Sequence, residues 1–132
     1  MGTTNYTDTF IQVADDCPVT EAEVPPEKPS SPSIAALQHA LISARPYELT
    51  SDDVLFEVHR LRQQADAGSR DDYFAKDRAC LRSSPLGKRY GWGVHHDAHG
   101  HVALVAVESQ RYAELAADAS LRQTKAMRSK RA

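Results

Sequence analysis

The clearest pattern of apolar and polar positions lies in residues 89–107, where two apolar segments flank Asp97-Ala98-His99-Gly100. An aspartate that opens a turn can hydrogen-bond the backbone two residues on, and a glycine at its end can adopt the left-handed conformation. These residues therefore predict a β-hairpin with a bulge at Gly100. The predicted register pairs Trp92 with Ala106, Val94 with Leu104 and His96 with Val102, and it places these side chains on one face.

The other face of the predicted hairpin carries Gly91, Gly93 and His95 on its first strand. Interior glycines weaken a strand but let another element approach the backbone closely. We favour a packed helix over a ligand as the group that covers this face. The return strand, His101–Val107, is apolar on both faces and is therefore expected to be covered on both sides.

A short strand and a proline-rich segment precede the first predicted helix. Residues 7–14 alternate in polarity and predict a strand, which we expect to join the hairpin because two strands alone are only marginally stable. The prolines of residues 18–32 exclude a helix or an inner strand, so this segment is an extended arm or a loop. Ser33 is expected to cap a helix that runs to about Ala44, with Ile34, Leu37, Leu41 and Ala44 at helical spacing.

Three more helices follow from start signals and spacing. Thr50 to Asp53 resembles a capping box and predicts a helix to about Gln64, and Ser69 begins a third helix that we expect to reach about Leu81. A last helix begins near Ser109, and the basic residues 122–132 are expected to fray. The predicted fold is a single α+β domain of order β-α-α-(α)-β-β-α, in which three or four helices pack on a small, mainly antiparallel sheet.

Composition and charge narrow the function classes only slightly. The chain has 132 residues with a formal net charge of −2, which indicates no strong preference for nucleic acid or an acidic membrane. No apolar segment reaches transmembrane length and no signal peptide is visible, so we expect a cytoplasmic protein without membrane contact. Its two cysteines fit a reducing compartment. The acidic residues 1–30 are predicted to lie near the basic residues 76–90.

Four histidines, His95, His96, His99 and His101, lie close together in the sequence. Imidazole is a common ligand of zinc, copper and nickel. Adjacent strand residues point to opposite faces, however, so His95 and His96 cannot converge on one ion. We therefore expect neither a metal site nor a cofactor here.

Cys80 lies between Arg78 and Arg82, and neighbouring cations can activate a thiol as a nucleophile. His95 is a possible base for such a reaction. An enzyme that acts on a small anionic substrate through Cys80 or His95 is therefore one alternative. The simpler interpretation is that Cys80 is a small buried apolar residue.

Residues 83–90 combine small residues, a turn and two cations, which favours binding of phosphate or carboxylate. The segment lacks the spacing of a Walker loop. The predicted function is a small soluble binding or interaction domain with a small anionic ligand. Nucleic-acid contact through residues 122–131 is a further alternative, although such a basic terminus is usually solvated, and a homodimer stays open. The candidate ligand-binding residues are Arg82, Lys88, Arg89, Tyr90, Trp92 and His95.

Four segments of the chain carry a resemblance to a known family: residues 4–11, 14–18, 51–56 and, most specifically, 83–93 (SSPLGKRYGWG). They resemble a family of small, uncharacterised, mostly bacterial proteins that is catalogued only as a domain of unknown function. The resemblance spans nearly the whole chain and implies a complete single-domain protein. It implies no activity, substrate or cofactor.

Overall fold

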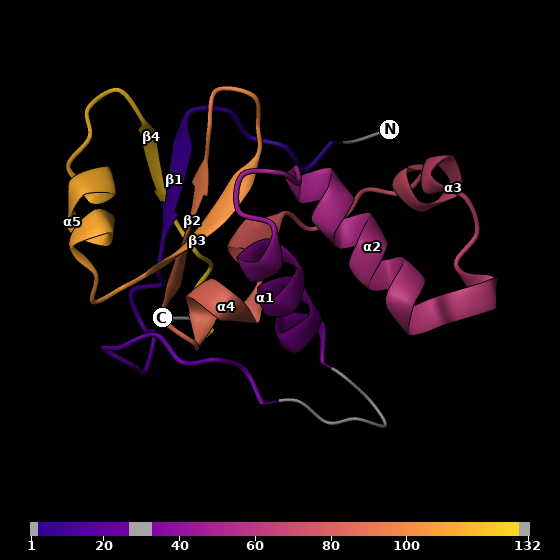
Figure 1. The fold of residues 1–132 in the computed structure, drawn as a ribbon, viewed down its shortest axis with the longest axis horizontal. Coiled ribbons are helices and arrows are strands. Elements are labelled where there is room, and N and C mark those ends of the chain that lie inside the picture. Colours follow the sequence, from indigo (N-terminus) through magenta and orange to yellow (C-terminus); the bar gives the residue numbers. More distant parts are fainter. Residues whose placement is uncertain (1–2, 27–32, 130–132) are drawn as a thin grey trace.

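The computed structural model describes residues 3–26 and 33–129, and its four strands form one sheet of order β3-β2-β1-β4 (Figure 1). The helices pack on both faces of this sheet, with α5 alone on one face and α1, α2 and α4 on the other. This arrangement confirms the predicted α+β class. The elements in chain order are β1 (Thr9–Gln12), α1 (Ile34–Ala44), α2 (Ser51–Gln63), η1 (Gln64–Asp66), α3 (Arg70–Phe74), η2 (Leu81–Ser83), α4 (Pro85–Lys88), β2 (Trp92–His96), β3 (Val102–Ala106), α5 (Gln110–Ala116) and β4 (Arg122–Lys125).

The β2–β3 hairpin forms in the predicted register. Trp92 pairs with Ala106, Val94 with Leu104 and His96 with Val102. Gly100 has a φ of 81°, in the left-handed region that favours glycine. The side chain of Asp97 accepts hydrogen bonds from the backbone N–H of His99 and of His101, both at 2.9 Å. The turn therefore forms for the reasons expected from its residues.

Strand β1 joins the hairpin, as predicted, and it lies in the centre of the sheet, antiparallel to β2 and parallel to β4. The expectation that residues 122–132 fray is wrong for Arg122–Lys125, which form β4. Main-chain bonds hold this segment, from Arg122 N to Asp8 O at 2.8 Å and from Ala126 N to Gln12 O at 2.7 Å. The side chains of β4 are largely exposed, so its hydrophobic pattern gives no sign of a strand. Residues 130–132 lie outside the described part of the chain.

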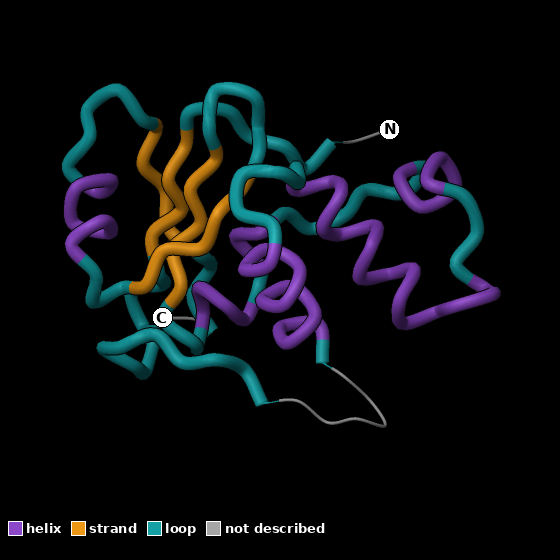
Figure 2. The backbone as a smooth tube through the Cα atoms, viewed as in Figure 1, coloured by secondary structure: helices purple, strands orange, loops and turns teal. Residues whose placement is uncertain are grey.

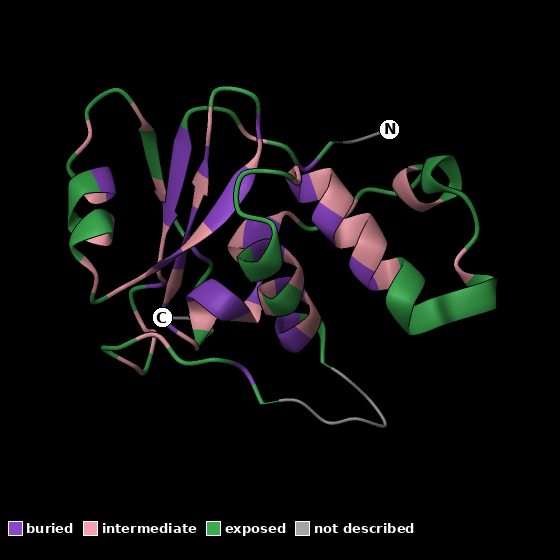
Figure 3. Ribbon diagram, viewed as in Figure 1, coloured by how far each residue is buried: buried purple, intermediate pink, exposed green. Residues whose placement is uncertain are grey.

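Two hydrophobic clusters sandwich the sheet. The larger one joins Ile11, Val94 and Val102 to Ile42 of α1 and Val54 of α2. The smaller one joins Phe10, Val105 and Leu115 on the α5 face. Burial is concentrated in the strands and in the inner sides of α1 and α4, whereas the end of α2 is exposed (Figure 3).

Two helical predictions need correction. The third helix ends at Phe74 rather than near Leu81, and Arg78 Nε donates to Tyr73 O at 2.8 Å, the carbonyl that a continuing helix would use. Residues 83–90, expected to form a loop, contain the short helix α4, with Ser84 as its cap and Pro85 at its first position. On α1, Ile34 and Ala44 are exposed, and the buried side includes Ala35, Gln38 and Ile42 instead.

The glycine face of the hairpin is covered by protein, as favoured from the sequence. A Cβ at Gly93 would lie 2.8 Å from the Phe10 ring and 2.9 Å from the Tyr112 ring.

We therefore expect Gly93→Ala to lower the free energy of unfolding by about 1–3 kcal/mol in urea titrations, because the two rings must shift. Phe10→Leu in the Gly93→Ala background should recover part of that loss, and unchanged stability of the single variant would contradict this packing.

The proline-rich arm lies across the start of β2. Figure 2 shows this loop passing beneath the sheet before α1. Glu23 N donates to Tyr90 O and Trp92 Nε1 donates to Glu23 O, each at 2.8 Å. The arm thus contacts Tyr90, in the segment predicted for it, through backbone groups. Asp15 pairs with Lys125 at 2.7 Å rather than with a cation of residues 76–90. The rest of the predicted arm, residues 27–32, lies outside the described residues.

Candidate functional site

A pocket of about 350 Å³ opens between α1, α2 and the segment that leads into α4. We call it the Arg78 pocket. A smaller hollow of about 160 Å³ adjoins it and shares several of its residues. The pocket is lined by Ile34 and Gln38 of α1, Leu55 of α2, Tyr73 of α3 and the segment residues Arg78, Ala79, Cys80, Ser83, Ser84 and Pro85. Its wall is mainly apolar with a few polar groups, which is the usual character of a small-molecule site.

Gln38 contributes a side-chain amide to this wall, and the residue is only 3% exposed. Ser84 Oγ accepts the Leu86 N–H at 3.1 Å as the cap of α4, so its own proton is donated to Gln38 Oε1 at 2.5 Å. That bond fixes the orientation of the amide, because oxygen must face Ser84. The Gln38 NH₂ group is therefore turned away from Ser84, and it has no hydrogen-bond partner among the described residues.

Arg78 supplies the positive charge of the pocket. Its guanidinium lies 4.0 Å from the centre of the Tyr73 ring, and Nε donates to Tyr73 O at 2.8 Å. The side chain is half-buried, and no carboxylate of the described residues forms an ion pair with it. A rigidly held guanidinium with free N–H groups is well suited to bind a carboxylate or phosphate.

A third hollow, of about 310 Å³, lies on the other side of α2 and shows the opposite arrangement. Arg70 pairs there with Asp53 at 2.8 Å, and Arg45 pairs with Glu48 at 3.6 Å. Its cations are therefore matched by the chain's own acids. This contrast makes the Arg78 pocket the better candidate for an external anion.

Cys80 brings a thiol to the same pocket. Its Sγ lies 3.2 Å from the hydroxyl of Tyr6 in a side-chain hydrogen bond. That bond, together with burial and the electrostatic interaction with Cys80, raises the pKa of Tyr6, whereas the Arg82 and Arg122 charges lower it. Tyr6 thus stays protonated, and either its hydroxyl or the Cys80 thiol can donate the shared hydrogen.

The structure separates the residues predicted to bind a ligand. Trp92 is covered by Glu23 of the arm and by the His39 ring, 5.0 Å away. Lys88 and Arg89 end α4, and Tyr90 accepts the Glu23 N–H through its carbonyl. The backbone N–H groups of Lys88, Arg89 and Tyr90 bond to carbonyls of the same segment. Of the predicted loop, the Ser83–Pro85 end alone contributes to the Arg78 pocket.

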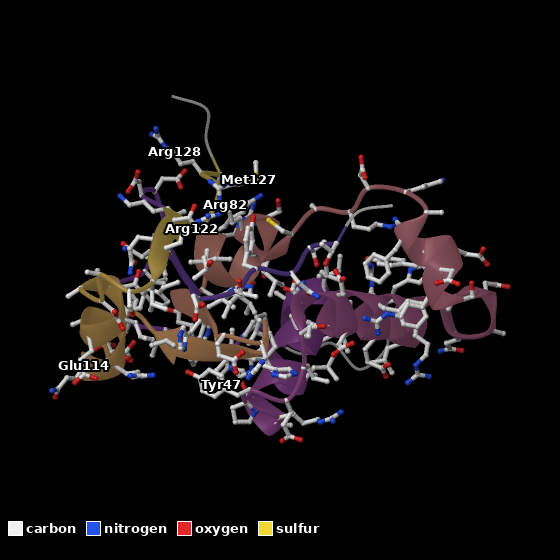
Figure 4. The ribbon with its side chains drawn as sticks, turned by 90° about the horizontal axis from the view of Figure 1, so that it is seen from above. Tyr47, Arg82, Glu114, Arg122, Met127 and Arg128 are labelled. Carbon is white, nitrogen blue, oxygen red and sulfur yellow. The ribbon has the colours of Figure 1, made fainter. Side chains whose placement is uncertain are left out.

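Arg82 points toward β4 rather than into the pocket, since its Nε donates to Lys125 O at 2.8 Å. Figure 4 shows Arg82, Arg122, Met127 and Arg128 gathered at one end of the molecule, away from Tyr47. Lys125, in the same segment, is already paired with Asp15. Nucleic-acid contact through residues 122–131 stays a prediction.

His95 lies on the α5 face of the sheet, apart from Cys80. Its Nδ1 is 2.8 Å from the hydroxyl of Tyr47, and burial, with the Arg111 charge, lowers its pKa. His96 points to the opposite face, as expected, and is fully buried. Within residues 3–26 and 33–129, no three His, Cys, Asp or Glu side chains are arranged to hold a metal ion.

Comparison with known proteins assigns the chain to a family. The model of a family of unknown function, DUF6157, matches residues 1–132. The chain belongs to this family. No curated protein and no solved structure matches the chain. Membership in DUF6157 confirms the resemblance noted in the sequence, and it assigns no activity, so a function must be argued from the pocket.

Sequence reasoning singled out neither Gln38 and Tyr73 of this pocket nor Tyr6, which contacts the pocket residue Cys80. Gln38 is a polar residue within the buried side of α1, and that position is a usable signal once the helix face is known. Tyr6 and Cys80 are 74 positions apart, so no local pattern connects them. Across the described part of this DUF6157 chain, no helix is long and apolar enough to cross a bilayer.

Proposed function

We propose that this chain is a binding domain for a small amphipathic carboxylate, held in the Arg78 pocket. The ligand is still an anion, as predicted, but its site lies at the Ser83–Pro85 end of residues 83–90. The carboxylate accepts hydrogen bonds from the Gln38 NH₂ group and from the Arg78 guanidinium. The apolar part of the ligand lies against Ile34, Leu55 and Pro85.

The orientation of Gln38 carries this proposal. Gln38 lines the pocket, and no described residue accepts a hydrogen bond from its NH₂ group, so both N–H donors are free for a ligand there. Arg78 beside it selects an acceptor with negative charge. The volume of about 350 Å³ suits a molecule the size of a medium-length fatty acid.

We place this activity in the cytoplasm, since Cys17 and Cys80 are both free thiols, as in a reducing compartment. Cys80 lines the pocket, so the alternative function, an enzyme that acts through Cys80, uses the same site. His95 faces the other side of the sheet and is not assigned a role here.

Octanoate is the probe that tests the proposal, with Gln38→Glu as the variant. Wild-type protein should bind octanoate with a dissociation constant below about 1 mM in calorimetry, and octanamide much more weakly. Gln38→Glu keeps the oxygen that accepts from Ser84 but replaces the NH₂ donors with a negative charge. Octanoate binding should therefore weaken at least about 30-fold.

Gln110→Glu is the matched control, since Gln110 is exposed at the start of α5 and the charge change is the same. It should leave octanoate binding unchanged. Equal octanoate affinity in wild type and Gln38→Glu, or equal affinity for octanoate and octanamide, would refute the proposed site.

A further inference from the structure

Resting on the proposed function, we propose that Cys80 accepts an acyl group from an acyl thioester, so that the pocket holds the acyl chain on its own thiol. The substrate class is a medium-length acyl thioester. The free carboxylate bound by the pocket is then the hydrolysed form of that acyl group.

Cys80, Gln38 and Arg78 line the same pocket. Cys80 is the nucleophile, and its Sγ is hydrogen-bonded to the Tyr6 hydroxyl at 3.2 Å. Gln38 lines this pocket and is 3% exposed. Its NH₂ group has no partner among the described residues, so it can donate to the thioester carbonyl oxygen. Arg78 adds positive charge on that side, as an oxyanion requires. The apolar wall receives the chain.

The step balances without a further reactant. The Cys80 sulfur, as thiolate, attacks the carbonyl carbon of the thioester, and the carbonyl π electrons move to the oxygen that faces Gln38. When the carbonyl re-forms, the bond to the departing sulfur breaks and a new carbon–sulfur bond to Cys80 remains. The proton that Cys80 lost goes through solvent to the departing thiolate. Tyr6 donates its O–H to the Cys80 thiolate before attack.

The test uses the octanoyl thioester of N-acetylcysteamine with the full chain and intact-protein mass spectrometry. We expect one octanoyl group on Cys80, added about 100-fold faster than to free N-acetylcysteine under the same conditions. Cys17→Ser should react like wild type, and Cys80→Ser should not be acylated as a thioester. Tyr6→Phe should slow the reaction, because the Cys80 thiolate loses its hydrogen-bond donor.

The outcomes separate the two proposals. Acylation at a rate equal to that of N-acetylcysteine, or equally at Cys17, would overturn the acyl-transfer inference. If octanoate still binds in a Gln38-dependent way under that outcome, the proposed function stands. If octanoate does not bind either, both fail.

Discussion

Replacing His96 with leucine should stabilise the protein and remove most of its sensitivity to acid. His96 is 0% exposed, and neither ring nitrogen has a hydrogen-bond partner among the described residues. Its closest aromatic neighbour is Tyr6, at 5.4 Å between ring centres in an edge-on arrangement. A buried imidazole without partners costs about 1–3 kcal/mol, which leucine of similar size avoids.

The acid sensitivity follows from the same burial. Burial lowers the pKa of His96 from 6.5 to about 4. The main chain of Val94 acts in the opposite direction, but it forms no hydrogen bond with either ring nitrogen. Protonation therefore favours the unfolded chain. The stability linked to His96 is fully present above the unfolded pKa of 6.5 and is lost as pH falls toward about 4. The loss across that window is about 3 kcal/mol.

Urea unfolding at about pH 7.5 and about pH 4.5 measures both effects. Wild type should lose stability between the two values, whereas His96→Leu should be more stable near neutral pH and lose much less. His99→Leu, in the exposed turn, is the control and should keep the wild-type pH dependence. If His96→Leu were destabilised near neutral pH and kept the full acid loss, His96 would have a stabilising partner.

Placing a carboxylate at Ala126 should cost about 3–5 kcal/mol or prevent folding. Ala126 is 4% exposed and belongs to the larger hydrophobic cluster. A Cβ at Gly87 would lie 2.8 Å from the Ala126 Cβ, so the two backbones are closely packed. Ala126→Asp would bury an unpaired charge there, and urea titration should show the loss directly.

Met127→Asp is the neighbouring control, because Met127 is 48% exposed. It should change the free energy of unfolding by less than about 0.5 kcal/mol. A frayed C-terminal segment would make the two variants equal. Equal stability would therefore contradict the assignment of residues 122–126 to the folded body.

The hairpin could be predicted in full because its determinants are local. Asp97 and Gly100 set the turn, and alternation on both sides sets the register. Strand β4 could not be predicted in this way. It pairs in parallel with β1, more than a hundred positions away, and its side chains are mostly exposed, so neither proximity in sequence nor an apolar pattern marks it.

The candidate site was only partly predictable for a similar reason. The basic, Ser-rich residues 83–90 predict an anion site, and the Ser83–Pro85 end of them, with Cys80, does line the pocket in which we propose one. The donor that defines the pocket is an amide on α1, and its orientation depends on Ser84, 46 positions further along the chain. Lys88, Arg89 and Trp92 follow the same segment in sequence, but α4 and the arm turn them elsewhere.

The central claim is that a carboxylate ligand meets the Gln38 NH₂ group inside the Arg78 pocket. The most direct measurement is an NMR titration with octanoate that follows the side-chain amide of Gln38 and, as a reference, the indole N–H of Trp92. The Gln38 NH₂ signals should shift in a saturable way while the Trp92 signal stays in place. Saturable shifts at Trp92 with Gln38 unchanged, or no saturable shift at either, would contradict the account.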